Sequence, residues 1–262
     1  MIADERRQHA IQFLAERGFV ALPALASELG VSESTARRDL AQLEQEGLIK
    51  RTHGGAVFVS DRFSVLTYAT REMEAEEEKT SIGRAAAALV ADGEAVLLDG
   101  GTTTFQLARQ LIGRPLQVVT NSLPIANLFG SSPETELILV GGYLYPKTGV
   151  ACGPLAQRML EAIHVNKVFM GAAGLVEEGC FNANTLMVEA ERQMMKCADE
   201  VVILADHLKF GRRALVKLCS YDEVSCIVSD DQVPADWREK LTNVGVTLRI
   251  GAPDRSQVET QL

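Results

Sequence analysis

Residues 32–51 read SESTARRDLAQLEQEGLIKR and predict a helix with two contrasting faces. Ser32 can cap this helix, and apolar side chains then recur at helical spacing along one face, at Ala36, Leu40 and Leu43. The opposite face carries short hydroxyls and two guanidinium groups, at Ser34, Thr35, Arg37 and Arg38. A helix in the DNA major groove needs such a face, because small polar side chains allow close approach and arginine binds guanine or phosphate. The stretch therefore predicts a DNA-recognition helix.

The residues before this helix predict the first part of a helix-turn-helix. An amphipathic pattern indicates a helix over residues 4–17, and Pro23 can open a second, short helix. Gly30 and Val31 then form a tight turn directly before Ser32. The alternative without DNA binding is a three-helix bundle in which Arg37 and Arg38 are only exposed to solvent.

The residues after the helix predict a basic wing. Gly47 ends the helix, and an extended strand begins over residues 48–51. Gly54 and Gly55 turn the chain, which returns over residues 56–59. We expect Arg51 or His53 of this hairpin to contact DNA phosphate beside the recognition helix.

This part of the chain resembles the DeoR family of bacterial transcriptional regulators. The resemblance rests on the run VSESTARRDL from Val31 to Leu40, followed by Gly47-Leu48, Arg51 and the run HGGA that starts at His53. The core Thr-x-Arg-Arg-Asp-Leu and the wing motif stand at the family's separation. Ala36 is a departure, because the family usually carries a β-branched residue there.

Composition is consistent with a DNA-binding protein but does not establish one. The chain has 262 residues, enough for two domains, and a formal net charge of −9. Residues 1–56 are close to charge balance, so the acidity lies in the remainder. DNA binding would then depend on a local basic patch and on dimerisation rather than on bulk charge.

The cysteines and histidines indicate neither a disulfide framework nor a metal site. The five cysteines are odd in number without a Cys-x-x-Cys pair, and the four histidines lack ligand spacing. We expect reduced, mostly buried thiols, no metal and no cofactor. Neither a signal peptide nor a membrane-spanning apolar run is evident, which predicts a cytoplasmic protein without membrane association.

Beyond a polar connector, the chain alternates short apolar runs with helical patterns. The domains expected are a winged helix-turn-helix over residues 1–58, a linker over 59–78, an α/β domain over 79–252 and a tail over 253–262. Predicted strands cover residues 94–99, 116–120, 136–140, 167–170, 201–205, 225–229 and 246–250, and predicted helices cover 105–111, 123–129, 155–163, 187–198 and 234–243, with one more ending near Val90. Continuous apolar strands predict a mostly parallel sheet covered by helices, hence an α/β fold.

Ligands of such sheets bind at the carboxyl ends of the strands, where polar residues follow several of the predicted strands. Asp99 precedes a Gly-Gly-Thr-Thr-Thr turn, in which the backbone of Gly101, Thr102, Thr103 and Thr104 can cradle an anion at a helix N-terminus. Asn121 and Ser122 follow the next strand, and Asp206 with Lys209 follows a later one. We expect phosphate at the turn and Lys209, with sugar hydroxyls at Asn121 and Asp99 or Asp206. The alternative without a ligand is that residues 101–104 form an ordinary turn and that Lys209 is a surface lysine.

Here the resemblance to the DeoR family extends across nearly the whole chain. Its sensor domain is matched by Asp99-x-Gly-Thr-Thr, Thr120-Asn-Ser, Gly141-Gly142, Gly153-Pro154 and Asp206-x-x-Lys-Phe-Gly. The resemblance implies a fold similar to ribose-5-phosphate isomerase and a repressor whose operator binding responds to a phosphorylated sugar or polyol. Glu191 departs from the Lys-Arg common in the family, at a position that we expect to be remote from these motifs.

Two enzymatic alternatives can be weighed on the residues. Residues 141–148 imitate a P-loop, but Pro146 stands where a glycine is needed, which argues against nucleotide hydrolysis. The second alternative is a sugar-phosphate isomerase fused to a DNA-binding module. The similar isomerases carry Asp-Gly-Ala-Asp-Glu, whereas residues 170–174 read MGAAG and have lost all three acids. Because isomerisation needs a general base, we expect no catalytic residues here. A purely architectural DNA protein would leave the second domain without a role.

Overall fold

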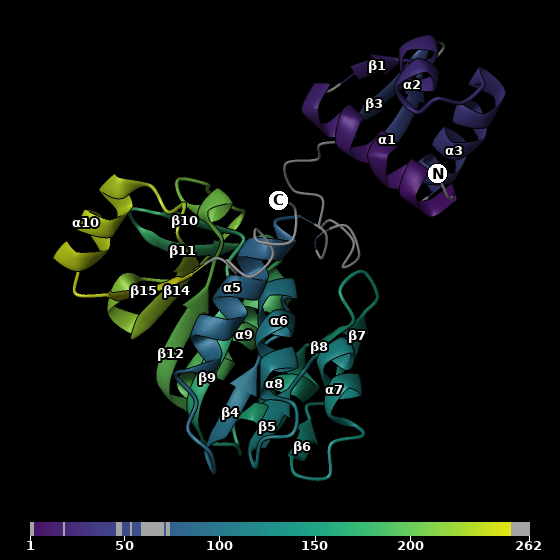
Figure 1. Cartoon of the computed structure of the whole chain (residues 1–262). Coiled ribbons are helices and arrows are strands. Elements are labelled where there is room, and N and C mark those ends of the chain that lie inside the picture. The colour runs from purple at the N-terminus through teal and green to yellow at the C-terminus, as the bar shows by residue number, and fades with distance from the viewer. Residues whose placement is uncertain are drawn as a thin grey trace, which may run out of the picture. The chain divides into compact units, whose positions relative to one another are not determined.

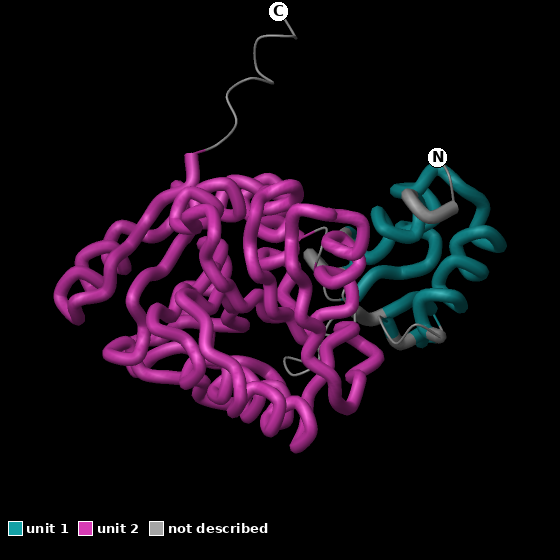
Figure 2. The backbone as a smooth tube through the Cα atoms, turned by 90° about the horizontal axis from the view of Figure 1, so that it is seen from below, with its two compact units in different colours: residues 1–66 teal, residues 67–262 magenta. Residues whose placement is uncertain are grey.

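The computed structural model describes residues 3–17, 19–45, 49–52, 54–58, 71 and 74–252. The chain divides into two compact units, residues 1–66 and residues 67–262 (Figure 2). Each unit has its own hydrophobic core.

The N-terminal unit is a winged helix-turn-helix, as predicted. Gly30, in the left-handed conformation at φ +63°, makes the turn between its second and third helices. The elements are α1 (Ala3–Arg17), β1 (Phe19–Ala21), α2 (Leu22–Glu28), α3 (Glu33–Gln45), β2 (Ile49–Thr52) and β3 (Gly55–Phe58).

Strand β1 was not predicted, because three residues are too few to show a strand pattern. It pairs antiparallel with β3, so that the wing is a sheet in the order β1-β3-β2. Gly55 is required at this pairing, since a Cβ there would lie 2.1 Å from the carbonyl oxygen of Val20. The second glycine of the wing motif therefore serves packing as well as the turn.

The C-terminal unit is built on a seven-stranded parallel sheet in the order β15-β14-β12-β9-β4-β5-β6 (Figure 1). All seven strands lie where apolar runs predicted them. They are β4 (Ala95–Leu98), β5 (Gln117–Thr120), β6 (Glu136–Leu139), β9 (Val165–Gly171), β12 (Ala198–Leu204), β14 (Cys226–Asp230) and β15 (Thr247–Gly251).

Helices cover both faces of this sheet and form a core on each side. On one face Ile82, Leu107 and Phe129 are buried between the sheet and α5 (Glu76–Ala87), α6 (Thr102–Leu111) and α7 (Leu123–Phe129). The other face is covered by α8 (Pro154–Leu160), α9 (Thr185–Lys196) and α10 (Ala235–Asn243). These helices agree with the predicted ones to within a few residues.

Two small antiparallel additions were not predicted. One is the hairpin of β7 (Tyr143–Tyr145) and β8 (Val150–Cys152), which contains the P-loop-like residues. A P-loop leads from a strand into a helix, so this hairpin lacks the P-loop geometry. The other is a three-stranded sheet of β10 (Gly174–Val176), β11 (Gly179–Asn182) and β13 (Val216–Cys219).

All five cysteines are buried as free thiols, which agrees with the sequence prediction. Within the described part of the chain, no three metal-ligating side chains gather into a cluster. No helix of these residues is both long enough and apolar enough to cross a lipid bilayer.

Candidate DNA interface and ligand site

The start of α3 is organised by hydroxyl groups. The backbone N–H of Thr35 donates to Oγ of Ser32 at 3.3 Å, which makes Ser32 the predicted cap. Oγ of Ser32 also lies 2.9 Å from Oγ of Ser34 and 3.0 Å from Oγ1 of Thr35. The three predicted polar side chains therefore form one cluster at the N-terminal end of the helix.

Arg37 and Arg38 project from the exposed face of α3, opposite the buried side chains of Ala36, Leu40 and Leu43. Arg37 also lines an open hollow between α3 and the β2–β3 hairpin. Exposed arginines next to small hydroxyls provide the donors that bind guanine edges and phosphates.

Arg51 is held by an acidic side chain of the same unit. Its Nε donates to Oε2 of Glu44 at 2.6 Å, and its backbone N–H donates to Oε1 at 2.8 Å. This pairing anchors β2 to α3 and orients the Arg51 side chain, which remains partly exposed. His53, the other predicted wing contact, lies outside the described residues.

Asp39 has a structural role that sequence reasoning did not assign. Arg6 of α1 donates from Nε to Oδ2 at 2.7 Å and from Nη2 to Oδ1 at 3.2 Å. The carboxylate is buried, so this two-point ion pair holds α3 against α1. The aspartate that follows Arg37 and Arg38 thus fixes the helix that presents them.

In the C-terminal unit, the residues predicted to bind a ligand follow neighbouring strands. Asp99 follows β4, Asn121 follows β5 and Asp206 lies just beyond β12. Strand β9 lies between β4 and β12, so parallel pairing brings these carboxyl ends to one edge of the sheet. We call the residues gathered there the edge site.

The turn after β4 leads directly into α6. Gly101 precedes the helix in an extended conformation, and the three threonines of the first turn are buried. The first turn of a helix leaves backbone N–H groups without acceptors of its own. Oγ1 of Thr104 also has no hydrogen-bond partner among the described residues. Unused donors at a helix N-terminus suit an anion.

Asn121 and Ser122 have different roles in the structure. Oγ of Ser122 accepts the N–H of Ile125 at 3.4 Å and so caps α7. Asn121 donates from Nδ2 to the carbonyl oxygen of Ala151 at 3.2 Å, while its Oδ1 has no partner among the described residues. Asn121 therefore keeps an unused acceptor, whereas Oγ of Ser122 is engaged in capping α7.

Asp206 and Lys209 lie on one turn beyond β12. Oδ1 of Asp206 accepts the N–H of Leu208 at 3.1 Å, and Oδ2 lies 3.7 Å from Nζ of Lys209. That Oδ2 makes no hydrogen bond within the described part of the chain. Lys209 is therefore a largely buried cation rather than a surface lysine.

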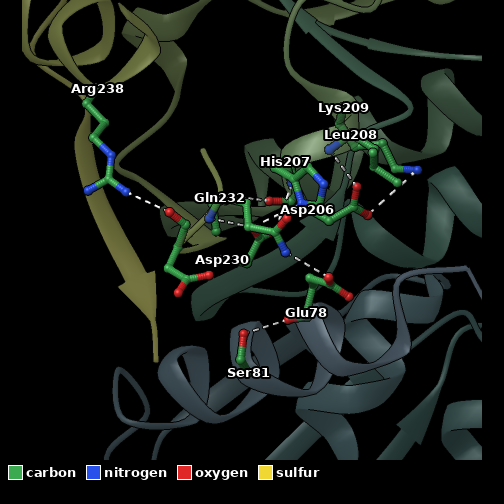
Figure 3. A network of polar contacts seen from close by, with 12 residues as sticks. Glu78, Ser81, Asp206, His207, Leu208, Lys209, Asp230, Gln232 and Arg238 are labelled. Atoms are coloured by element: carbon green, nitrogen blue, oxygen red, sulfur yellow. Dashed lines mark hydrogen bonds and ion pairs between the residues drawn. The ribbon is translucent and has the colours of Figure 1, made fainter. Parts of the chain in front are cut away.

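A second carboxylate, Asp230, positions this turn (Figure 3). Asp230 ends β14 and is buried, and it accepts the backbone N–H of His207 at 2.8 Å. Its Oδ1 lies 3.1 Å from Nδ1 of His207 and accepts the N–H of Gln232 at 2.9 Å. Gln232 in turn donates to Glu78 of α5 at 2.9 Å. These contacts connect the Lys209 turn to the start of α5.

Three cations meet at the edge site, and sequence reasoning identified only Lys209. Lys79 of α5 is buried, and its Nζ donates to the carbonyl oxygens of Arg71 and Glu74. Burial, reinforced by the charge of Lys209, lowers the pKa of Lys79 to about 8. Arg71 also acts electrostatically on Lys79. Arg71 lies in the predicted linker and Lys79 in the first turn of the helix predicted to end near Val90. Neither follows a predicted strand, so the sequence did not indicate them as site residues.

Glu191 corrects an expectation, since it is not remote from the motifs. It is buried on α9, and its Oε2 accepts a hydrogen bond from Nδ2 of Asn182 at 2.8 Å. Burial and then the charge of Asp99 raise its pKa well above the usual range for glutamate. The pKa of Asp99 is raised as well, by burial, while Arg71 opposes the shift for both carboxyls.

Comparisons with known proteins identify the family of both units. Residues 6–62 match the DeoR-like helix-turn-helix domain, and residues 74–231 match the DeoR C terminal sensor domain. The chain belongs to the DeoR family. Regulators of this family bind DNA through the N-terminal unit, so the protein is a DNA-binding transcriptional regulator.

Several relatives extend over the whole chain. The regulator GlpR of Haloferax volcanii is 34% identical over 95% of this chain and 98% of its own. The transcriptional repressor GlcR of Bacillus subtilis is 31% identical over 98% of this chain and 100% of its own. Ribose 5-phosphate isomerase A of Methanocaldococcus jannaschii is 22% identical over 52% of this chain and 55% of its own, with a TM-score of 0.39. That TM-score is too low for the likeness to support a functional conclusion.

Proposed function

We propose that this DeoR-family regulator is a repressor of a carbohydrate-utilisation operon, and that a phosphorylated sugar or polyol controls its operator binding. The observation that supports this most is the composition of the edge site. Arg71, Lys79 and Lys209 supply positive charge, and the first turn of α6 supplies free N–H groups. Phosphate needs both kinds of donor.

Unpartnered acceptors beside these donors suit the hydroxyl groups of a sugar. Oδ1 of Asp99, Oδ1 of Asn121 and Oδ2 of Asp206 make no hydrogen bond among the described residues. A buried acceptor without a partner is costly, so a ligand that donates to these atoms would stabilise the folded state. The relatives named for transcriptional regulation and repression favour a regulatory use of this binding.

The test is calorimetric titration with a panel of phosphorylated sugars and polyols, preceded by a thermal-shift screen. A ligand should raise the melting temperature, because binding stabilises the folded state by an amount that grows with the logarithm of ligand concentration over Kd. Lys209→Ala should then weaken binding by roughly 1.5–3 kcal/mol, because it removes a charge-assisted contact. Operator binding without ligand should persist in this variant. Unchanged ligand affinity in Lys209→Ala would show that Lys209 does not bind the phosphate of the ligand.

We infer that the edge site binds without catalysis. The segment after β9, Gly171 to Gly174, carries none of the acids that a sugar-phosphate isomerase needs. The pair of Asp99 and Glu191 is the one feature that favours the alternative, an isomerase fused to a DNA-binding module. Incubation with aldose phosphates decides between them, since turnover by the purified protein would establish the enzyme.

We also infer a cytoplasmic homo-oligomer that binds a repeated or inverted-repeat operator. One helix-turn-helix contacts only a few base pairs, so two copies on half-sites about one helical turn apart are needed for useful specificity. Ser32, Ser34, Thr35, Arg37, Arg38, Arg51 and His53 are the proposed DNA contacts. A monomeric mass in light scattering, together with full operator affinity, would contradict the assembly.

A further inference from the structure

Two carboxyl groups of the edge site, those of Asp99 and Glu191, lie near enough to interact electrostatically. Asp99 follows β4 and is 4% exposed, while Glu191 of α9 is 3% exposed. The charge of Asp99 acts on Glu191, and the charge of Arg71 acts on both carboxyls. Two carboxylates in a water-poor environment repel each other strongly unless a proton or a cation lies between them.

Backbone contacts place Glu191 at the carboxyl ends of β4 and β9. Asn182, which donates to Glu191, accepts the N–H of Ala173 at 2.7 Å, and its Nδ2 lies 3.5 Å from the carbonyl oxygen of Gly171. Gly171 ends β9, and its Cα lies 4.0 Å from the position that a Cβ on Gly101 would take. Glu191 is thus fixed next to the turn that follows Asp99.

The atoms left without partners near this pair are mainly acceptors. Oδ1 of Asp99 and Oδ1 of Asn121 have no hydrogen bond within the described residues, and both side chains are more than nine-tenths buried. The Asn121 side chain adjoins the Asp99 carboxyl. A ligand group that fills this end must therefore donate several hydrogen bonds.

The two lysines and the Asp99–Glu191 pair lie toward different strands of the edge site. Lys209 forms an ion pair with Asp206 beyond β12, and Lys79 interacts electrostatically with both residues, whereas Asp99 follows β4 and Glu191 is held next to the end of β9. A hydroxyl donates one hydrogen bond and carries no charge. An ammonium group donates three and also offsets the repulsion between two carboxylates.

We propose that the ligand of the edge site is a phosphorylated sugar with a free primary amine, and that its ammonium group binds between Asp99 and Glu191. This inference rests on the proposed function, in which the same site binds the phosphate. It adds the chemical class of the sugar and makes Glu191 the residue that determines specificity.

The experiment compares matched pairs of ligands by calorimetric titration of the full chain. Glucosamine 6-phosphate is measured against glucose 6-phosphate, and galactosamine 6-phosphate against galactose 6-phosphate. At least one amino sugar should bind at least ten-fold more tightly than its neutral partner, and its N-acetylated form should lose that advantage. If the neutral sugars bind as well as the amino sugars, the amine inference is wrong and the proposed function stands. If none of these phosphates binds while another phosphorylated sugar or polyol of the wider panel does, the amine inference is wrong and the proposed function stands; if no member of the panel binds, both fail.

Two substitutions on α9 separate a specific role of Glu191 from a general one. Glu191→Gln keeps the shape and an acceptor for Asn182 but removes the charge, so the ratio between amino and neutral sugar should fall toward one. Glu189→Gln is the matched control, because Glu189 is exposed on the same helix and contacts Gln157. It should leave the ratio unchanged. Asp99→Asn provides the same test if Glu191→Gln melts too low to titrate. Retention of the full ratio in the charge-removing variant would overturn the inference.

Discussion

Glu74 forms an ion pair with Lys209, with Oε2 of Glu74 lying 3.7 Å from Nζ of Lys209. The lysine is largely buried, whereas the glutamate is 41% exposed. Glu74 also accepts, through its carbonyl oxygen, a hydrogen bond from Lys79. Glu74, which lies two residues before the start of α5, is therefore next to two of the cations that we assign to phosphate binding.

Glu74→Gln should strengthen ligand binding, because an anionic ligand no longer competes with a carboxylate for Lys209. A partly exposed ion pair is worth up to about 1 kcal/mol, which corresponds to roughly a five-fold lower Kd. Calorimetry with an identified ligand measures the change. Glu76→Gln, an exposed change in the first turn of α5, should have no effect. Weaker binding by Glu74→Gln would show that Glu74 contacts the ligand instead.

Ligand affinity should decline as the pH rises through about 8. Lys79 has a pKa lowered to about 8, so it is charged below that pH and loses its proton above it. A bound phosphate favours the charged form of Lys79, so near pH 8 binding is accompanied by protonation of this lysine. Binding therefore weakens as the pH increases. Titrations between pH 7 and 9.5 test this, and Lys79→Met should flatten the profile. A flat profile for the parent protein would contradict the role of Lys79.

In the protein without ligand, Glu191 should make the free energy of unfolding fall as the pH rises. Its folded-state pKa is raised, chiefly by burial, so the folded protein holds a proton that the unfolded chain releases above about pH 4.5. The stability contributed by that proton is complete below the unfolded pKa and is lost as pH rises through the folded one. Glu191→Gln should therefore stabilise the protein more at pH 8 than at pH 5, as measured by thermal melts. Glu189→Gln should show no such trend.

Arg37→Ala and Arg38→Ala should each weaken operator binding. Loss of a base contact costs about 1–3 kcal/mol and relaxes specificity, whereas loss of a phosphate contact lowers the salt slope by about one. Titrations of operator and unrelated DNA at several salt concentrations separate the two cases. Arg109→Ala, an exposed position on α6 of the other unit, is the control. Parental affinity in both α3 variants would mean that α3 does not contact the operator.

Asp39→Ala should destabilise the N-terminal unit while leaving the C-terminal unit intact. The substitution removes a buried carboxylate and leaves Arg6 without its two-point partner. We expect the transition of the N-terminal unit to fall by several degrees in calorimetric scans, with operator affinity reduced because α3 loses its anchor to α1. Glu33→Ala, an exposed change on the same helix, should leave that transition in place.

The sequence alone determined the fold class and the family of this protein. Seven largely apolar runs predicted the seven parallel strands, because helices cover both faces of such a sheet and bury most of its side chains. Strand ends also predicted Asp99, Asn121, Asp206 and Lys209, since parallel strands place their carboxyl ends at one edge. Short elements such as β1 escaped prediction, because a few residues carry no periodic signal.

Only the tertiary structure decided which other charges join those residues. Arg71 and Lys79 come from the start of the C-terminal unit, and Glu191 lies on a helix that packs on the sheet far along the chain. No local pattern marks them, because their role arises from burial and from neighbours distant in sequence. The pKa of Lys79 and that of Glu191 depend on desolvation and on facing charges, which exist only once the chain has folded.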